Sequence, residues 1–176
     1  MTKNKKGFTI IEVVLVLAIA GLIFLMVFIA LPALQRSQRN TRRRQDMARI
    51  LSAFTEYASN NGGAVPDSNE KLSTFVNSYI TGNSSYSTKD TVTTDTMKCG
   101  NVDQFCDPDG SSYYFNGIES GVVDKSSESF SHKIFYVQNA TCSPIDEGKT
   151  VAGNGNRDIA ILYALEGGAI YCGDNH

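Results

Sequence analysis

A single carboxylate stands beside a long apolar stretch near the N-terminus of this chain. Glu12 comes directly before 22 uncharged residues, 13–34. An ionised side chain in an apolar setting costs about 2.5–3.5 kcal/mol on insertion scales, so it normally has a partner. The chemistry expected of Glu12 is therefore ion pairing with a cationic group, unless its side chain merely reaches the polar surface of a membrane.

Four cysteines form the second group with readable chemistry, and all of them lie after residue 98. An even number of cysteines behind an export-type N-terminus favours disulfides over metal ligands or redox chemistry. Three pairings are possible. We prefer Cys99–Cys106 together with Cys142–Cys172, because this choice closes the shortest loop and ties the last predicted strand to an earlier one.

The other residues include no recognisable catalytic motif. The chain has two histidines, and it lacks a phosphate-binding glycine motif and a nucleophile elbow, so we expect neither an enzyme nor a cofactor. The only candidate metal element is Asp107-Pro108-Asp109-Gly110. It resembles the start of a calcium loop, but Ile118 stands where the distal glutamate is needed. The sequence favours a simple turn here and no metal site.

The apolar stretch is long enough for a helix that crosses a membrane. Twenty-two residues at 1.5 Å each span roughly 33 Å. A cleavable secretory signal would have a shorter apolar core of about 7–15 residues and a small-residue cleavage site after it. We therefore expect a membrane-spanning helix over about 13–34. Pro32 removes a helix hydrogen bond, which predicts a kink or an unwound turn near the membrane exit.

A helical pattern continues beyond the apolar stretch. Apolar residues recur at helical spacing on one face: Met47, Ile50, Leu51, Phe54, Tyr57 and Ala58. Asn60-Asn61-Gly62-Gly63 then supplies residues that favour a helix end. The pattern predicts one helix over 8–61, with a spanning lower half and an amphipathic upper half, 35–61, that packs against a head formed by 62–176.

The head reads as an α+β fold. A helix start at 66–70 precedes a short amphipathic helix, and 81–96 reads as a polar surface loop. Strands are predicted at 112–115, 133–137, 159–165 and 169–172. The last two form an antiparallel hairpin around Glu166-Gly167-Gly168. Both faces of 159–165 are apolar, which indicates a central strand. We expect its smaller face, formed by Ala160, Leu162 and Ala164, to lie under the long helix.

Charge is distributed unevenly along the chain. Residues 1–61 carry nine Lys/Arg and three Asp/Glu, a net charge of +6, whereas residues 62–176 carry seven and fifteen, a net charge of −8. Six arginines gather between Arg36 and Arg49. They could form a solvated or lipid-headgroup face, contact the acidic heads of adjacent subunits, or bind nucleic acid. The last is weakly supported because no aromatic residue lies within 35–49 to stack on bases.

The segment Gly7-Phe8-Thr9-Ile10-Ile11-Glu12, with its basic start and the apolar helix after it, resembles the prepilin signature of type IV pilins. The resemblance covers residues 1 to about 60. It implies that a membrane-embedded peptidase removes a leader, 1–7, by cutting after Gly7, and that Phe8 is then N-methylated. It also implies that Glu12 neutralises the α-amino group of a neighbouring subunit. A proline that the family commonly has at the position of Ile29 is displaced here to Pro32.

The function implied by this resemblance is that of a structural subunit of a type IV pilus, serving adhesion, surface motility or DNA uptake. Its partners would be copies of itself through the N-terminal helices, the prepilin peptidase/methyltransferase, and the pilus assembly machinery with its inner-membrane platform. The precursor would lie in the inner membrane, and the mature subunit in an extracellular pilus. The alternatives are a pseudopilin of a type II secretion system and a membrane-anchored extracellular binding protein that does not polymerise.

Overall fold

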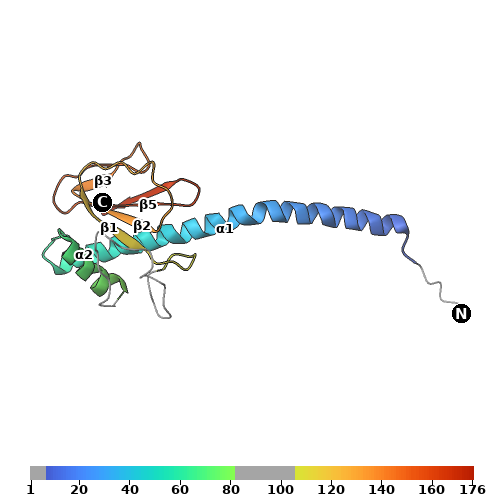
Figure 1. The fold of residues 1–176 in the computed structure, drawn as a ribbon, viewed down its shortest axis with the longest axis horizontal. Coiled ribbons are helices and arrows are strands. Elements are labelled where there is room, and N and C mark those ends of the chain that lie inside the picture. The colour runs from blue at the N-terminus through green and yellow to red at the C-terminus, as the bar shows by residue number, and fades with distance from the viewer. Residues whose placement is uncertain (1–6, 82–105) are drawn as a thin grey trace. The chain divides into compact units, whose positions relative to one another are not determined.

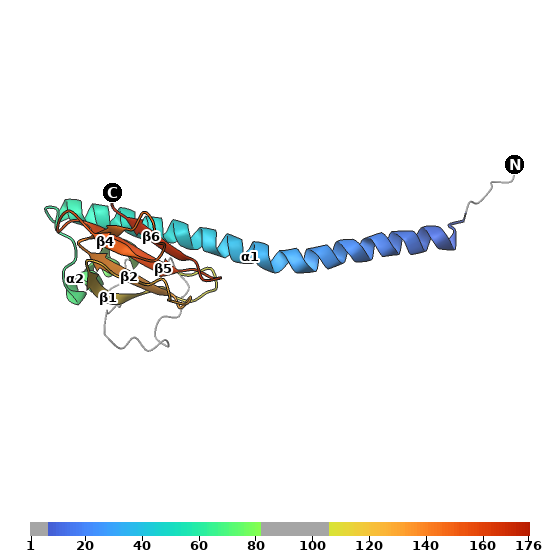
Figure 2. The same cartoon turned by 90° about the horizontal axis from the view of Figure 1, so that it is seen from above.

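The computed structural model describes residues 7–81 and 106–176 of the chain. Two compact units are present, Met1–Gln38 and Arg39–His176, and helix α1 (Ile10–Asn60) belongs to both. The elements and their order can be followed in Figures 1 and 2. After α1 come α2 (Asn69–Phe75), a π-helical segment η1 (Val76–Thr81), and strands β1 (Tyr114–Ser120), β2 (Lys133–Gln138), β3 (Ala140–Cys142), β4 (Thr150–Ala152), β5 (Ile159–Ala164) and β6 (Ile170–Asp174).

Helix α1 confirms the prediction of one long helix. By length and composition it is apolar enough to cross a membrane, and none of the apolar window that qualifies it is buried. The helix is uninterrupted at Pro32, so the expectation of an unwound turn is wrong. One proline removes a single backbone hydrogen bond. The turns on either side of Pro32 keep their own bonds and carry the helix through.

The C-terminal part of α1 belongs to the second unit and is buried along one face. Its buried residues follow helical spacing: Arg43, Met47, Ile50, Ala53, Phe54 and Tyr57. The helix ends at Asn60 as predicted. Gly62 and Gly63 adopt φ values of 65° and 85°, and the N–H of Gly63 donates to the carbonyl of Ala58 at 2.7 Å. Glycine supplies this left-handed turn without a side-chain clash.

The short second helix also forms where the sequence predicts it. Ser68 has an extended backbone, and its hydroxyl accepts from the N–H of Lys71 at 3.3 Å, so it caps α2. Phe75 of α2 stacks on Phe54 of α1 with ring centroids 3.9 Å apart. Most of the predicted polar loop, residues 82–96, lies outside the described residues.

A four-stranded sheet with the order β1-β2-β5-β6 forms the centre of the second unit. The β2/β5 and β5/β6 pairs are antiparallel, and β5 is a central strand as predicted. The expectation of an antiparallel sheet fails at one pair, because β1 runs parallel to β2. β1 also extends beyond the predicted 112–115. Its register shifts between Phe115 and Ile118, and this irregular stretch carries no strand-like alternation.

The two faces of β5 pack against different partners, and here one expectation is wrong. The larger side chains, including Ile161 and Tyr163, join the core that holds α1 and α2. The small face, Ala160, Leu162 and Ala164, belongs to a separate cluster with the β3–β4 ribbon and contains no residue of α1. Figure 1 shows the ribbon and α1 on opposite sides of the sheet. Small side chains on this face leave room for the ribbon backbone to approach the sheet.

One predicted disulfide joins this ribbon to the sheet. Cys142 of β3 and Cys172 of β6 are bonded, with Cα atoms 5.8 Å apart. This is the preferred pairing for these two residues. Cys106 is also disulfide-bonded, and its predicted partner, Cys99, lies outside the described residues. The bond closes a loop that holds β4 and β5, so it fixes the ribbon over the small face of β5.

Candidate functional site

The candidate processing site lies just before α1. Gly7, Phe8 and Thr9 form no regular secondary structure, and α1 begins at Ile10. Phe8 is 89 % exposed, and no atom lies within 4 Å of a Cβ placed on Gly7. A peptidase needs an accessible backbone at the bond it cuts. The bond between Gly7 and Phe8 lies in an exposed segment outside regular secondary structure.

Glu12 has a partner within its own chain. The N–H and the hydroxyl of Thr9 both donate to Oε2 of Glu12, at 2.8 and 2.9 Å, and the N–H of Glu12 donates to the Thr9 hydroxyl at 3.3 Å. This is a capping box, in which two otherwise unpaired N–H groups of a first helical turn are satisfied reciprocally. The Thr-x-x-Glu spacing is the sequence signal of a capping box, and this capping box was not among the predictions from the sequence.

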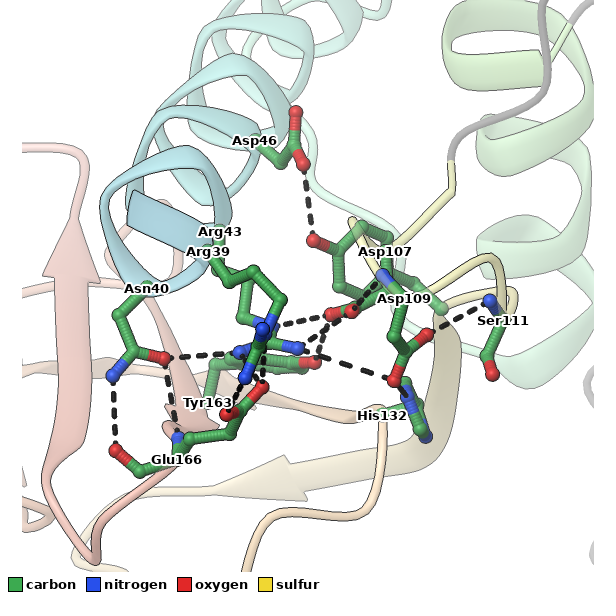
Figure 3. A network of polar contacts seen from close by, with 11 residues as sticks. Arg39, Asn40, Arg43, Asp46, Asp107, Asp109, Ser111, His132, Tyr163 and Glu166 are labelled. Carbon is green, nitrogen blue, oxygen red and sulfur yellow. Dashed lines mark hydrogen bonds and ion pairs between the residues drawn. The ribbon is translucent and has the colours of Figure 1, made fainter. Parts of the chain in front are cut away.

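A second polar site lies in the Arg39–His176 unit and is shown in Figure 3. Its centre is Arg43, whose side chain has no exposed area. The guanidinium donates to Asp107 through Nε at 2.5 Å and through Nη2 at 2.7 Å, a bidentate pair. Its Nη1 donates to Oε1 of Glu166 at 2.6 Å. The ring of Phe130 lies 4.1 Å from Cζ, so an aromatic face covers the cation.

Arg39 and Asn40 extend the same network by one helical turn. Arg39 donates to both oxygens of Glu166, at 2.9 and 2.6 Å. The Asn40 amide donates to the backbone carbonyl of Glu166 at 2.9 Å and accepts from its N–H at 3.2 Å. Glu166 lies in the turn between β5 and β6. Helix α1 therefore binds both the side chain and the backbone of Glu166, mostly through charge-assisted hydrogen bonds.

The Asp107–Gly110 segment forms the predicted turn. The N–H of Gly110 donates to the carbonyl of Asp107 at 2.9 Å, and that of Asp109 donates to Oδ1 of Asp107 at 3.0 Å. Asp107, Asp109 and His132 place one ligand atom each within 4.8 Å of one another. However, Asp107 is held by Arg43, and Asp109 lies 2.6 Å from Nε2 of His132. A cation would have to displace a buried guanidinium, so these contacts favour ion pairing over metal binding.

The network stabilises the charged form of its acids. The hydrogen bonds from Arg39 and Arg43 lower the pKa of Glu166 to about 2. Burial raises the pKa of Asp109, but the hydrogen bonds from His132 and Ser111 outweigh it and bring the pKa to about 2. Burial raises the pKa of Tyr163 far above its ordinary value. Its hydroxyl stays protonated and donates to Asp107 at 3.2 Å.

The structure revises the interpretation of the arginine cluster at Arg39 and Arg43. Arg43 is fully buried and so forms no part of a solvated or lipid-facing surface, and both arginines pair with acids of the same chain instead of those of an adjacent subunit. The helical pattern did not predict the burial of Arg43. Arginine is almost never fully buried unless it is paired, and its partners cannot be identified from the helical pattern. The partners stand 64 and 123 residues from Arg43, and no local spacing links them. Among the side chains that the structure describes, no buried polar atom lacks a hydrogen bond.

Comparison with known proteins addresses the N-terminal segment alone. Residues 2–28 match the prokaryotic N-terminal methylation motif, which is the leader signature of type IV pilins and pseudopilins. The matched residues include Gly7, Phe8 and Glu12. Neither a curated protein nor a solved structure matches the chain. The assignment of the leader signature therefore rests on residues 2–28.

Proposed function

We propose that this chain is the precursor of a structural subunit of a type IV pilus. Cleavage after Gly7 and N-methylation of Phe8 precede polymerisation into an extracellular filament. The subunit acts mechanically, in adhesion, surface motility or DNA uptake, and not as an enzyme. The observation that carries the proposal is the methylation motif at residues 2–28, which runs into a long helix whose apolar window is not buried.

The chemistry of assembly follows from what cleavage releases. A cut after Gly7 frees the amine of Phe8, four residues before Glu12. In a helix extended back to Phe8, the two groups would lie about 6 Å apart along the axis, at 1.5 Å per residue. Both Thr9 bonds go to Oε2 of Glu12, and no described residue donates to Oε1. That oxygen is available to the amine of a neighbouring copy. Such a contact between different patches on identical chains repeats into an open filament.

The proposed organisation follows the same logic. Residues 1–7 are the leader, 8–61 the N-terminal helix and 62–176 the head. The precursor is held in the inner membrane by residues 13–34, where the prepilin peptidase/methyltransferase and the assembly platform reach it. Copies of the chain then replace lipid around the helix. Arg39 and Arg43 are already paired with acids of the chain, so two of the six arginines of the cluster are not free to bind nucleic acid.

A pseudopilin of a type II secretion system is the second candidate, because it shares the same leader signature. The two differ in the length of the filament, so electron microscopy of the cell surface separates them. Long surface filaments that contain this chain support the pilin. Processed chain without such filaments supports the pseudopilin.

Mass spectrometry of the mature protein tests the proposal most directly. The expected product begins at Phe8 and carries one added methyl group on its amine. An intact N-terminus, or a chain cut near residue 34, would contradict the proposal. Either result would leave the anchored binding protein, or a protein with an ordinary secretory signal, as the explanation of the apolar stretch.

A further inference from the structure

The outer face of the β3–β4 ribbon is both apolar and acidic. Three large apolar side chains are exposed in the described part of Arg39–His176, namely Val122, Ile145 and Val151, which are 73 %, 88 % and 39 % exposed. All three lie on or beside the ribbon. Soluble proteins show scattered apolar residues, but these share one small region with three exposed acids. We call the set Val122, Asp124, Ile145, Asp146, Glu147 and Val151 the ribbon face.

Backbone pairing builds this face. Asp124 bridges Lys149 in antiparallel register, and the N–H of Thr150 donates to the carbonyl of Val123 at 2.9 Å. Continuing that register by two residues places Val122 opposite Val151 on the same side. Thr150 points the other way, is buried, and its hydroxyl bonds to Gly121 at 2.7 Å. The segment 122–124 therefore pairs alongside β4 as a third segment of the ribbon. In this register the side chains of Val122 and Val151 both face outward.

The acids of the ribbon face are only loosely paired. Lys149 is the nearest cation, and its Nζ lies 3.5 Å from Asp124 and 3.7 Å from Asp146. These exposed contacts are longer than the 2.6 Å pairs of the Arg43 network. Three carboxylates against one ammonium leave the face at −2. The face should therefore accept cations, and its charge disfavours nucleic acid and anionic lipid.

The matching cations lie on α1. Arg42 and Arg49 are exposed, and neither forms an ion pair within 4 Å in the described chain; Asp46, the acid that lies between them on α1, accepts a hydrogen bond from the Tyr113 hydroxyl. They are seven residues apart, which is close to two helical turns, so both lie on one side of the helix. Arginine also carries a long apolar stem that can cover Val122 and Ile145 while its guanidinium reaches the acids. The two surfaces complement each other in charge and in apolar area.

The position of the two surfaces decides what kind of contact they can make. The ribbon covers one face of the sheet, and α1 from Arg39 to Asn60 covers the other (Figure 1). The same chain cannot bring its ribbon face to its own Arg42. We propose that the ribbon face binds Arg42 and Arg49 of a second copy of this chain. Because this contact joins different patches of identical chains, it can repeat from copy to copy along the proposed filament. The inference rests on the proposed filament and names one of its lateral contacts.

Charge reversal tests this contact in cells that express the full chain. Arg42→Glu with Arg49→Glu should reduce filament yield by at least about tenfold, because like charges then face each other across the contact. Asp146→Lys with Glu147→Lys should do the same. Combining all four changes should restore filaments, because the pairs are re-formed with reversed sign. The readout is subunit in the sheared filament fraction, alongside the level of Phe8-processed subunit in the membrane.

Matched controls change the same charge elsewhere. Arg44→Glu lies on another side of α1, and Glu70→Lys lies on α2; both residues are exposed. Filaments of these two variants should form at the unchanged yield. Wild-type filaments should also lose stability as salt rises, since exposed charge pairs are screened.

The outcomes separate the contact from the proposed function. Normal filaments from Arg42→Glu with Arg49→Glu, or no recovery in the four-fold variant, would overturn the contact while wild-type filaments keep the pilin assignment. Recovery in the four-fold variant would exclude a basic segment of another protein as the partner, because such a partner would not change sign. A processed wild-type chain that forms no filament would overturn both.

Discussion

The two parts of helix α1 differ in where their side chains find partners. In the first unit, which ends at Gln38, apolar side chains such as Leu17 and Phe28 are 65 % and 74 % exposed. In the second unit, Met47 and Ile50 have no exposed area. One continuous helix therefore carries an apolar surface that the described chain leaves open and an apolar surface that the same chain covers.

The polar groups of the two parts differ in the same way. Arg43 is fully buried and has three acidic partners within the chain, Asp107, Asp109 and Glu166. Glu12 is exposed, and among the described residues only one of its oxygens is bonded, to Thr9. The described part of the second unit thus covers its own apolar core, whereas the first unit leaves its apolar side chains and one carboxylate oxygen without partners in the described chain. In the proposed function these come first from the membrane and then from copies of the chain.

Glu12→Ala should have the largest effect on the first part. Filaments should be lost, because the freed amine of a neighbour would be left in an apolar setting without its counter-charge. The subunit should still insert into the membrane, since insertion depends on residues 13–34. Sheared filaments and membrane fractions are compared by immunoblot. Glu56→Ala, an exposed acid on the second part of α1, is the control and should leave filament yield unchanged. Normal filaments from Glu12→Ala would contradict the idea that Glu12 finds its partner in a neighbouring copy.

Arg43→Ala should have the largest effect on the second part. It leaves Asp107 and Glu166 without their shared cation, and breaking a buried pair in this way typically costs about 3–5 kcal/mol. Denaturant unfolding of the detergent-solubilised chain, followed by the near-ultraviolet signal of its tyrosines, measures the loss. The neighbouring exposed residue provides the control, because Arg44→Ala should change the free energy of unfolding by less than about 0.5 kcal/mol. Equal effects of the two changes would contradict the buried network.

Replacing both Cys142 and Cys172 by serine should come next. The bond spans 30 residues of sequence, and closing a loop of that length stabilises a fold by about 3–4 kcal/mol in the chain-entropy account, with about 2–4 kcal/mol typical. The double change avoids a free thiol. The same denaturant experiment measures it, and the effect should be confined to the second unit. An unchanged unfolding midpoint would show that the ribbon is held without the bond.

Acid should produce the smallest and most specific effect. The folded pKa of Glu166 is depressed from 4.5 to about 2, so its contribution to stability is complete above pH 4.5 and is lost as the pH falls toward 2. Glu166→Gln should therefore flatten the dependence of unfolding on pH within this window and leave the slope above pH 5 unchanged. An identical acid profile for both proteins would show that Glu166 is not held by the arginines.

Much of the fold follows from local patterns in the sequence. The spacing of Met47, Ile50 and Phe54 predicts the buried face of α1, and Gly62 and Gly63 predict its end, because helix periodicity and left-handed turns are encoded by neighbouring residues. The hairpin around Glu166 and the central position of β5 were also readable. So was the methylation motif, because its residues lie within one short segment.

Apart from the preferred Cys142–Cys172 bond, the pairings between distant segments were not predicted from the sequence. The parallel β1/β2 pair, the ribbon on the small face of β5, and the burial of Arg43 all depend on which segments meet after folding. The apolar residues on both faces of β5 predict that both faces are covered, but they do not identify which elements cover them. A buried arginine and an exposed one look alike in sequence. Only the tertiary structure decides between them, because it brings Asp107 and Glu166 to the same helical turn.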